Sequence, residues 1–125
     1  DGCTPLHIAC SKLKVEVVRE LLDRGADLEA RNHLGWRPLH FVCSQGGSLD
    51  LIRLLLDRGA RLEARSGDGC TPLHIACSKG KIEHVRLQLD RGADVEAMNN
   101  MGWRPLHYAV LNNWPRVARL LLDRR

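Results

Sequence analysis

Thr4-Pro5-Leu6-His7 is the stretch that decides the fold, because close copies of it recur along the chain. The copies are Arg37-Pro38-Leu39-His40, Thr71-Pro72-Leu73-His74 and Arg104-Pro105-Leu106-His107, at offsets of 33, 34 and 33 residues. The rest of each period repeats as well, with Leu-Asp-Arg-Gly-Ala-Asp at 22–27 and 89–94 and Leu-Asp-Arg-Gly-Ala-Arg at 56–61. A fixed period of this length indicates stacked units of supersecondary structure. The sequence therefore predicts a repeat protein.

Each period is predicted to hold two short helices joined by a turn. In the first period, the hydroxyl of Thr4 can accept a hydrogen bond from the helix N-terminus, and Pro5 suits the first helical position. A second helix is predicted from Val15 to Arg24, with an apolar stripe on one side. Helices this short are marginal in water, so they must pack against neighbours to form. The extra residue of the second period lies in the turn 45–48, where an insertion is tolerated.

These motifs resemble those of the ankyrin repeat family, whose signature includes Thr-Pro-Leu-His-x-Ala, a Gly-Ala-Asp turn and a helix–turn–helix period of 33 residues. The resemblance covers essentially all 125 residues. It implies an all-α repeat solenoid, an ankyrin repeat array in which stacked antiparallel helix pairs are linked by β-hairpin fingers. It also implies one domain, 1–125, with about four repeats at 1–33, 34–67, 68–100 and 101–125, the terminal ones incomplete. In this family the fingers and first helices form a concave surface, and the second helices face outwards.

A two-repeat period lies on top of the single one. Residues 1–12 are identical to residues 68–79, and Gly-Trp-Arg-Pro-Leu-His occurs at 35–40 and 102–107. Duplication of a two-repeat unit, in nature or by engineering, accounts for this pattern. Neither end has a recognisable polar cap, so a segment of a longer array, with possible end-to-end self-stacking of copies, is expected.

Composition narrows the function classes. The formal charge is +4, with arginines interleaved with aspartates and no run of like charges that is typical of a nucleic-acid-binding arm. No apolar stretch is long enough to span a membrane, and the N-terminus lacks the basic and apolar regions of a signal peptide. Most of the five cysteines fall at apolar repeat positions. They indicate a reducing, intracellular and specifically cytoplasmic location, with no disulfide framework.

Two sets of residues could in principle carry chemistry. The pairs His7/Cys10, His40/Cys43 and His74/Cys77 have a spacing that places both side chains on one side of a helix. Each pair offers only two ligands, so no metal site and no cofactor are predicted, and the family resemblance assigns the histidines to hydrogen bonds that link adjacent repeats. No residue stands out as a nucleophile with its own base, so the chain is predicted not to be an enzyme.

Several residues depart from the pattern of the repeats. Arg37 and Arg104 replace the capping threonine, which predicts a loss of about 1 kcal/mol at each helix N-terminus. Gln88 stands where other second helices have leucine, so its amide must reach a backbone group or weaken the third repeat. Leu13 occupies a turn position held elsewhere by Gly80, where a left-handed backbone strains leucine.

Three further expectations concern the surface. Arginine and aspartate at i,i+4 on the second helices are predicted to form ion pairs, namely Arg19/Asp23, Arg53/Asp57, Arg86/Asp90 and Arg119/Asp123. Trp114, before Pro115, is expected to shield the last helix pair. Glu29, Glu63 and Glu96 stand where many ankyrin repeats carry asparagine, so the hydroxylation known for that asparagine is not carried over.

The candidate binding residues are those that the family pattern places on the concave side. Trp36-Arg37 and Trp103-Arg104 are either a duplicated tolerated change or two recognition pairs, each an aromatic plate beside a guanidinium that seeks carboxylates. The other candidates lie at finger tips or at the ends of first helices: His33, Leu34, Asp68, Asn100, Met101, Lys12, Gln45, Lys79 and Asn112. The favoured function is a non-catalytic protein–protein interaction module for a protein or peptide partner, without nucleic acid or membrane. The alternative is a structural spacer or scaffold segment of a longer array, natural or engineered, with no ligand of its own.

Overall fold

The computed structural model describes all residues, 1–125, and contains eight α helices and no β strand. The first helices of the four repeats are α1 Pro5–Ser11, α3 Pro38–Gln45, α5 Pro72–Ser78 and α7 Pro105–Leu111. The second helices are α2 Val15–Asp23, α4 Leu49–Asp57, α6 Ile82–Asp90 and α8 Pro115–Asp123. Each of the four expected repeat ranges thus holds one helix pair, and the predicted all-α solenoid is confirmed.

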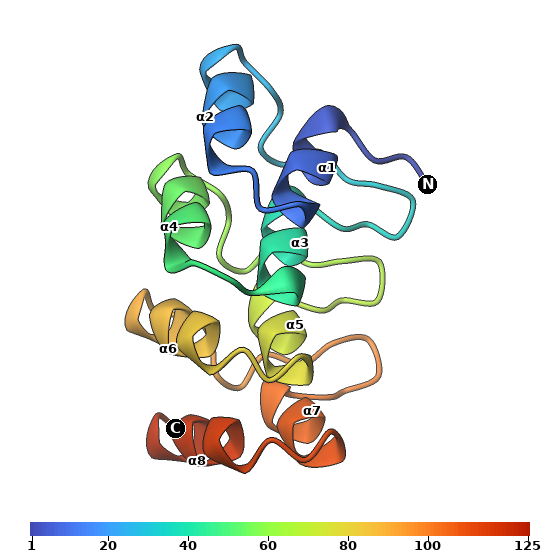
Figure 1. Cartoon of the computed structure of the whole chain (residues 1–125). Helices are drawn as coiled ribbons and strands as arrows, with labels where there is room; N and C mark the ends of the chain where they lie inside the picture. The colour runs from blue at the N-terminus through green and yellow to red at the C-terminus, as the bar shows by residue number, and fades with distance from the viewer.

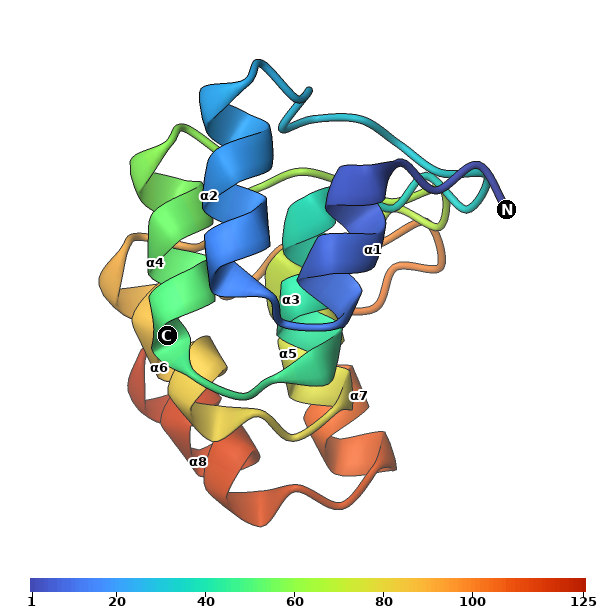
Figure 2. The same ribbon diagram turned by 45° about the horizontal axis from the view of Figure 1, so that its top comes forward.

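The helices form two parallel columns (Figure 1). The column α1–α3–α5–α7 carries the links that project to one side, and α2–α4–α6–α8 forms the opposite layer, an arrangement that is also visible after rotation (Figure 2). The core runs between the columns through all four repeats, because each helix pair buries its apolar face against the next. Its most enclosed side chains are Leu6, Leu39, Leu51, Ile52, Leu55, Leu73 and Leu121.

The helix N-termini show how threonine and arginine differ at the cap. Thr4 Oγ1 accepts the N–H of His7 at 3.2 Å, whereas Arg37 has no side-chain acceptor and makes no such bond. The His40 N–H instead donates to the backbone carbonyl of Arg37 at 3.0 Å. The predicted loss of the side-chain cap is therefore observed, but the amide that it would have satisfied is not left unpaired.

The links between repeats are finger-shaped turns and not regular β hairpins. In the first finger, the N–H of Asn32 donates to the carbonyl of Trp36 at 3.0 Å, and the Asn32 side chain accepts the N–H groups of Leu34 and Trp36. Each pair of adjacent fingers is joined by one backbone bond, Gly67 N–H to Leu34 O at 2.9 Å and Asn100 N–H to Asp68 O at 3.0 Å. Each finger is closed by too few backbone bonds for a β ladder, so the β-hairpin expectation holds for the shape but not for strand structure.

The turns between paired helices contain the expected left-handed residues. Leu13 has φ 57° and Asn113 has φ 59°, at the position where Gly80 has φ 69°. The extra residue of the second repeat is accommodated by Gly46 and Gly47, both with positive φ. The strain predicted for leucine is therefore present in the first repeat.

The predicted i,i+4 ion pairs on the outer layer, Arg19/Asp23, Arg53/Asp57, Arg86/Asp90 and Arg119/Asp123, are wrong. Arginine on α2, α4 and α6 turns towards an acid three residues earlier, as in Arg19–Glu16 at 3.8 Å. The aspartates instead pair with the arginine that ends the next second helix: Asp23–Arg58 at 2.7 Å, Asp57–Arg91 at 3.2 Å and Asp90–Arg124 at 2.7 Å. Stacking places the C-terminal ends of successive second helices side by side. The aspartate of one repeat therefore lies closer to the arginine of the next repeat than to the arginine four residues before it on its own helix.

Gln88 is fully buried and only half satisfied. Its Nε2 donates to the carbonyl of His84 at 3.2 Å and to the sulfur of Cys43 at 3.3 Å. Its Oε1 is buried without a hydrogen-bond partner. The predicted contact with a backbone group is therefore confirmed, and the predicted weakening of the third repeat stays a prediction, supported by the one unpaired polar atom.

Candidate functional site

Histidines of the first helices hold the fingers in place. His7 Nε2 lies 2.9 Å from the carbonyl oxygen of Trp36, His40 Nε2 lies 3.1 Å from that of Cys70, and His74 Nε2 lies 2.9 Å from that of Trp103. The inter-repeat role predicted for these histidines is confirmed. Each bond ends on the residue that precedes the N-cap of the next first helix. The histidine of one repeat therefore fixes the end of the finger that leads into the following repeat.

The two tryptophans of the predicted recognition pairs pack in the same way. Trp36 makes an edge contact with Phe41, with ring centroids 5.0 Å apart, and Trp103 does so with Tyr108 at 5.2 Å. Each indole also packs against the histidine of its own repeat, with ring centroids 5.9 Å apart for Trp36 and His40 and 5.6 Å apart for Trp103 and His107. Both indoles remain partly exposed. Two matched aromatic clusters therefore lie two repeats apart on the same side of the stack.

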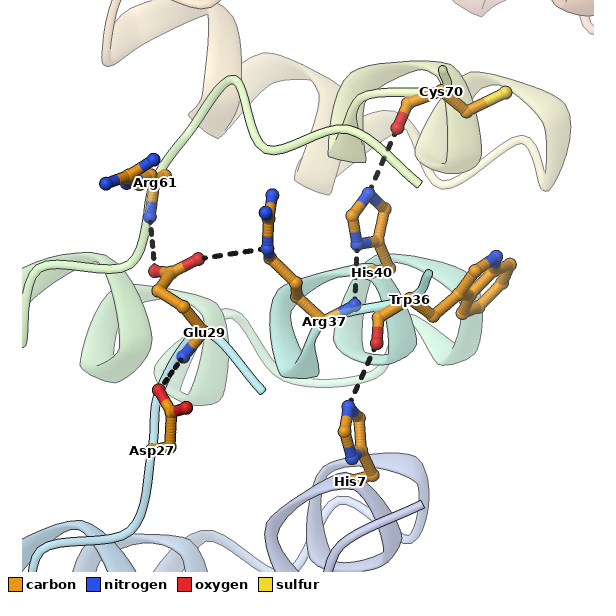
Figure 3. Close-up of polar contacts among 8 residues, drawn as sticks. All are labelled: His7, Asp27, Glu29, Trp36, Arg37, His40, Arg61 and Cys70. Carbon is orange, nitrogen blue, oxygen red and sulfur yellow. Dashed lines mark hydrogen bonds and ion pairs between the residues drawn. The ribbon is translucent and has the colours of Figure 1, made fainter. Parts of the chain in front are cut away.

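The arginines next to these tryptophans point elsewhere. Arg37 Nε lies 3.5 Å from Glu29 Oε1, and Arg104 Nε lies 3.0 Å from Glu96 Oε2. Figure 3 shows the indole of Trp36 and the guanidinium of Arg37 extending in different directions from adjacent backbone positions. The indole and the guanidinium thus belong to two separate features, an aromatic cluster and an internal arginine–glutamate pair, and the recognition role predicted for these residues stays a prediction.

The remaining predicted site residues are spread along the stack and are exposed to solvent. The finger tips carry two large apolar side chains, Leu34 at 69% exposure and Met101 at 68%. The other exposed candidates are His33, Asp68 and Asn100 on the fingers and Lys12, Gln45, Lys79 and Asn112 at the ends of the first helices. Of these, Asn100 donates from Nδ2 to Gly67 O at 3.1 Å, and Asn112 donates to Ser78 O at 2.8 Å. Both amides therefore also join repeats.

Sequence reasoning missed the role of the glutamates in the links. Glu29 Oε2 accepts the N–H of Arg61 at 3.0 Å, and Glu63 Oε2 accepts the N–H of Asp94 at 2.9 Å. Figure 3 shows Glu29 between Arg61 and Arg37. The recurrence of glutamate at one position of each link was the signal that could have predicted this cross-link between repeats.

Trp114 takes a role different from the expected one. Its Nε1 donates to the carbonyl of Ser78 at 3.0 Å. A Cβ placed on Gly80 would lie 2.5 Å from the indole ring. The side chain therefore covers the turn of the third repeat and does not close over the last helix pair alone.

A largely apolar hollow lies beside the second aromatic cluster. It encloses about 450 Å³ and is lined by Glu96, Trp103, Arg104, Leu106, His107, Val110, Leu111 and Arg125. Its lining combines charged side chains with aliphatic and aromatic ones, a combination that suits a protein or peptide side chain.

Three of the thiols, those of Cys10, Cys43 and Cys77, are fully buried in the stack. Burial raises the pKa of the Cys10 thiol to about 12 and also raises the pKa of Cys43 and Cys77. A buried neutral thiol is a poor nucleophile.

No three histidine, cysteine, aspartate or glutamate side chains are grouped so that they could hold a metal ion. None of the helices has the length and apolar content that crossing a lipid bilayer requires.

This fold defines a class: a solenoid of stacked helix pairs whose links project as fingers on the side of the first helices. A family model for ankyrin repeats, in three copies, matches residues 1–66 and 39–125. The chain belongs to the ankyrin repeat family.

Two curated relatives share parts of the array. Protein phosphatase 1 regulatory subunit 27 of Homo sapiens is 41% identical over 46 residues, which is 37% of this chain and 30% of that protein. NF-kappa-B inhibitor alpha of Gallus gallus is 44% identical over 43 residues, which is 34% of this chain and 14% of that protein. The matched segments thus span less than a third of either relative.

Proposed function

We propose that this chain is a non-catalytic protein–protein interaction module that binds a protein or peptide through its fingers and first helices. The observation that carries the proposal is the pair of matched aromatic clusters, Trp36 with Phe41 and Trp103 with Tyr108. Partly exposed tryptophan on a rigid framework is typical of residues that dominate binding energy. The relatives named as a regulatory subunit and an inhibitor support the same class, since both names describe action on another protein.

Rigidity favours binding by this surface. The histidine bonds and the finger-to-finger bonds hold the backbone of the face in place before a partner arrives. Less conformational entropy is then lost on association. Exposed Leu34 and Met101 at the finger tips extend the apolar contact area beyond the tryptophans.

The test is capture of partners from a source lysate, followed by measurement of affinity with the purified partner. Trp36→Ala combined with Trp103→Ala is expected to abolish binding while the helical circular dichroism spectrum stays unchanged. Trp114→Phe is the control, because it alters a tryptophan that belongs to neither aromatic cluster. Unchanged affinity in the double variant would reject the assignment of the site.

A second candidate function is that of a spacer or scaffold unit that stacks on further repeats. It is favoured by apolar side chains exposed on the two end faces of the stack: Ile8 and Val17 at one end, and Val110, Leu111 and Leu122 at the other. Such faces are like those that the internal repeats bury against one another.

The proposed location is a reducing, cytoplasmic compartment. All five cysteines are free thiols, and four of them are buried in the stack. A fold built around unpaired buried thiols is suited to an environment that keeps thiols reduced.

A further inference from the structure

The second link between repeats departs from the other two in charge. Arg61 stands where the first and third links have Asp27 and Asp94. In those links the aspartate accepts a hydrogen bond from the N–H two residues later, at 2.9 Å for both Glu29 and Glu96. Arginine has no oxygen with which to make this bond, so the second link loses a local contact and gains a cation.

The exchanged residue lies beside other arginines. Arg31, Arg37, Arg61 and Arg65 line one hollow of about 630 Å³ together with Glu63, Ala64 and Ser66. Arg31 and Arg65 occupy equivalent positions in successive links, and the third link has Met98 there. The cluster therefore exists only around the second link, where an aspartate has become arginine.

Intramolecular acids neutralise only part of this charge. Arg37 faces Glu29 at 3.5 Å, and Glu63 lies in the wall of the hollow. Arg65 donates from Nη1 to the carbonyl oxygens of Gly69 and Met98, at 2.9 and 2.6 Å, which fixes the side chain without cancelling its charge. The side chains of Arg31 and Arg61 are exposed to solvent, and the hydrogen bond of Arg61 to Glu29 uses its backbone N–H and leaves the guanidinium free.

We infer that this hollow is a binding site for a phosphate-type oxyanion. Four guanidinium groups against the carboxylates of Glu29 and Glu63 leave about two uncompensated positive charges. A phosphate monoester carries about −1.5 to −2 at neutral pH, so the charges match, and the guanidinium fork suits phosphate oxygens. A single carboxylate would neutralise only half of the charge.

The phosphate is carried by a protein partner. This part of the inference rests on the proposed function. Nucleic acid would need cations continued along a groove. The arginines that end the second helices are instead paired with aspartates of the preceding repeat, as in Arg58–Asp23. One isolated cationic hollow beside a protein-binding face fits one phosphorylated side chain.

Inorganic phosphate is the first probe, titrated at constant ionic strength into the 125-residue protein and followed by NMR. Saturable shifts of the arginine Nε–H signals around the hollow are expected. Arg61→Asp restores the residue of the other links, so it should fold, and it is expected to weaken phosphate binding at least tenfold. Arg119→Asp makes the same charge change on α8 and should change binding less than twofold.

The absence of saturable shifts, or equal weakening by both variants, would overturn the site. The Trp36→Ala/Trp103→Ala variant should bind phosphate normally, which separates failure of this site from failure of the proposed function. The carrier is tested with a phosphoserine peptide, the same peptide without phosphate, single-stranded RNA, and vesicles containing a phosphoinositide. Arg61-dependent preference for the phosphopeptide supports the inference, and an Arg61-dependent preference for RNA or vesicles contradicts a protein carrier.

Discussion

The imidazole of His40 and the backbone carbonyl of Cys70 join the second repeat to the third through a bond of 3.1 Å. The other ring nitrogen, Nδ1, accepts the N–H of Arg37 at 3.0 Å. A carbonyl can only accept, so Nε2 carries the proton and the ring is neutral. Protonation of Nδ1 would remove the acceptor for Arg37 N–H, and this couples the N-terminus of α3 to pH.

Stability is therefore expected to fall as the pH is lowered from 7 to 5. Burial lowers the pKa of His40 from 6.5 to about 4, and burial also lowers the pKa of His74. Below 6.5 the unfolded chain takes up a proton that the folded chain does not, so the stabilisation present above 6.5 is lost progressively towards 4. The full shift at His40 corresponds to about 3 kcal/mol. Urea unfolding at several pH values and NMR titration of the ring provide the measurement. A His40 ring that titrates near 6.5, or a flat stability profile between pH 7 and 5, would contradict this coupling.

Gln88→Leu is expected to stabilise the protein. The substitution removes the unpaired Oε1 and restores the residue found at Leu21, Leu55 and Leu121 of the other second helices. A buried unsatisfied polar atom costs about 1–3 kcal/mol, which exceeds the net value of the amide bond to His84. Urea unfolding should show a gain of about 1 kcal/mol. Leu55→Gln, the reverse exchange in the second repeat, should destabilise, and a loss of stability in Gln88→Leu would show that the amide is a net stabiliser.

Gly80→Ala is expected to displace Trp114. A Cβ at Gly80 would lie 2.5 Å from the indole, and the backbone there has φ 69°. The variant should lose the bond from Trp114 Nε1 to Ser78 and unfold more readily by about 2 kcal/mol or more, through strain and lost packing together. Gly92→Ala isolates the backbone contribution, since a Cβ added at Gly92 would meet no atom within 4 Å and its φ is 92°. Equal costs in the two variants, with the indole N–H signal of Trp114 unshifted in Gly80→Ala, would disprove the steric role.

Copies of the chain are expected to associate head to tail if the scaffold candidate is correct. Continuing the series Asp23–Arg58, Asp57–Arg91 and Asp90–Arg124 places Asp123 of one copy beside Arg24 of the next. Sedimentation velocity should then show concentration-dependent growth. Asp123→Arg should weaken association, and adding Arg24→Asp should restore it. A monomer at all concentrations would exclude this mode of stacking.

Much of the fold could be predicted because the same local signals are written several times. Pro at the first helical position, glycine after three of the second helices and the apolar stripes are properties of short segments, and repetition separates them from chance. The helix bounds, the left-handed backbone at Leu13 and the inter-repeat role of the histidines all agree with these predictions. The missing β strands have a local cause too, since each finger is closed by few backbone bonds.

The candidate site was less predictable, because it depends on which repeat a side chain faces. Helical spacing within α2 led to the Arg19/Asp23 pair, whereas Asp23 reaches Arg58 of the next repeat. Adjacency in sequence made Trp36 and Arg37 one site, whereas successive residues outside a helix direct their side chains to different surroundings, and Arg37 turns to Glu29.

The sequence by itself determined the period, the helix pairs and the buried stripe, since these follow from backbone preference and apolar spacing within one repeat. Only the tertiary structure decided the partners of charged side chains and the grouping of Arg31, Arg61 and Arg65 around one hollow. The physical reason is that a long, flexible charged side chain can reach several oppositely charged neighbours, and its attraction is strongest to the nearest one. Stacking in three dimensions sets those distances, and separation along the chain does not.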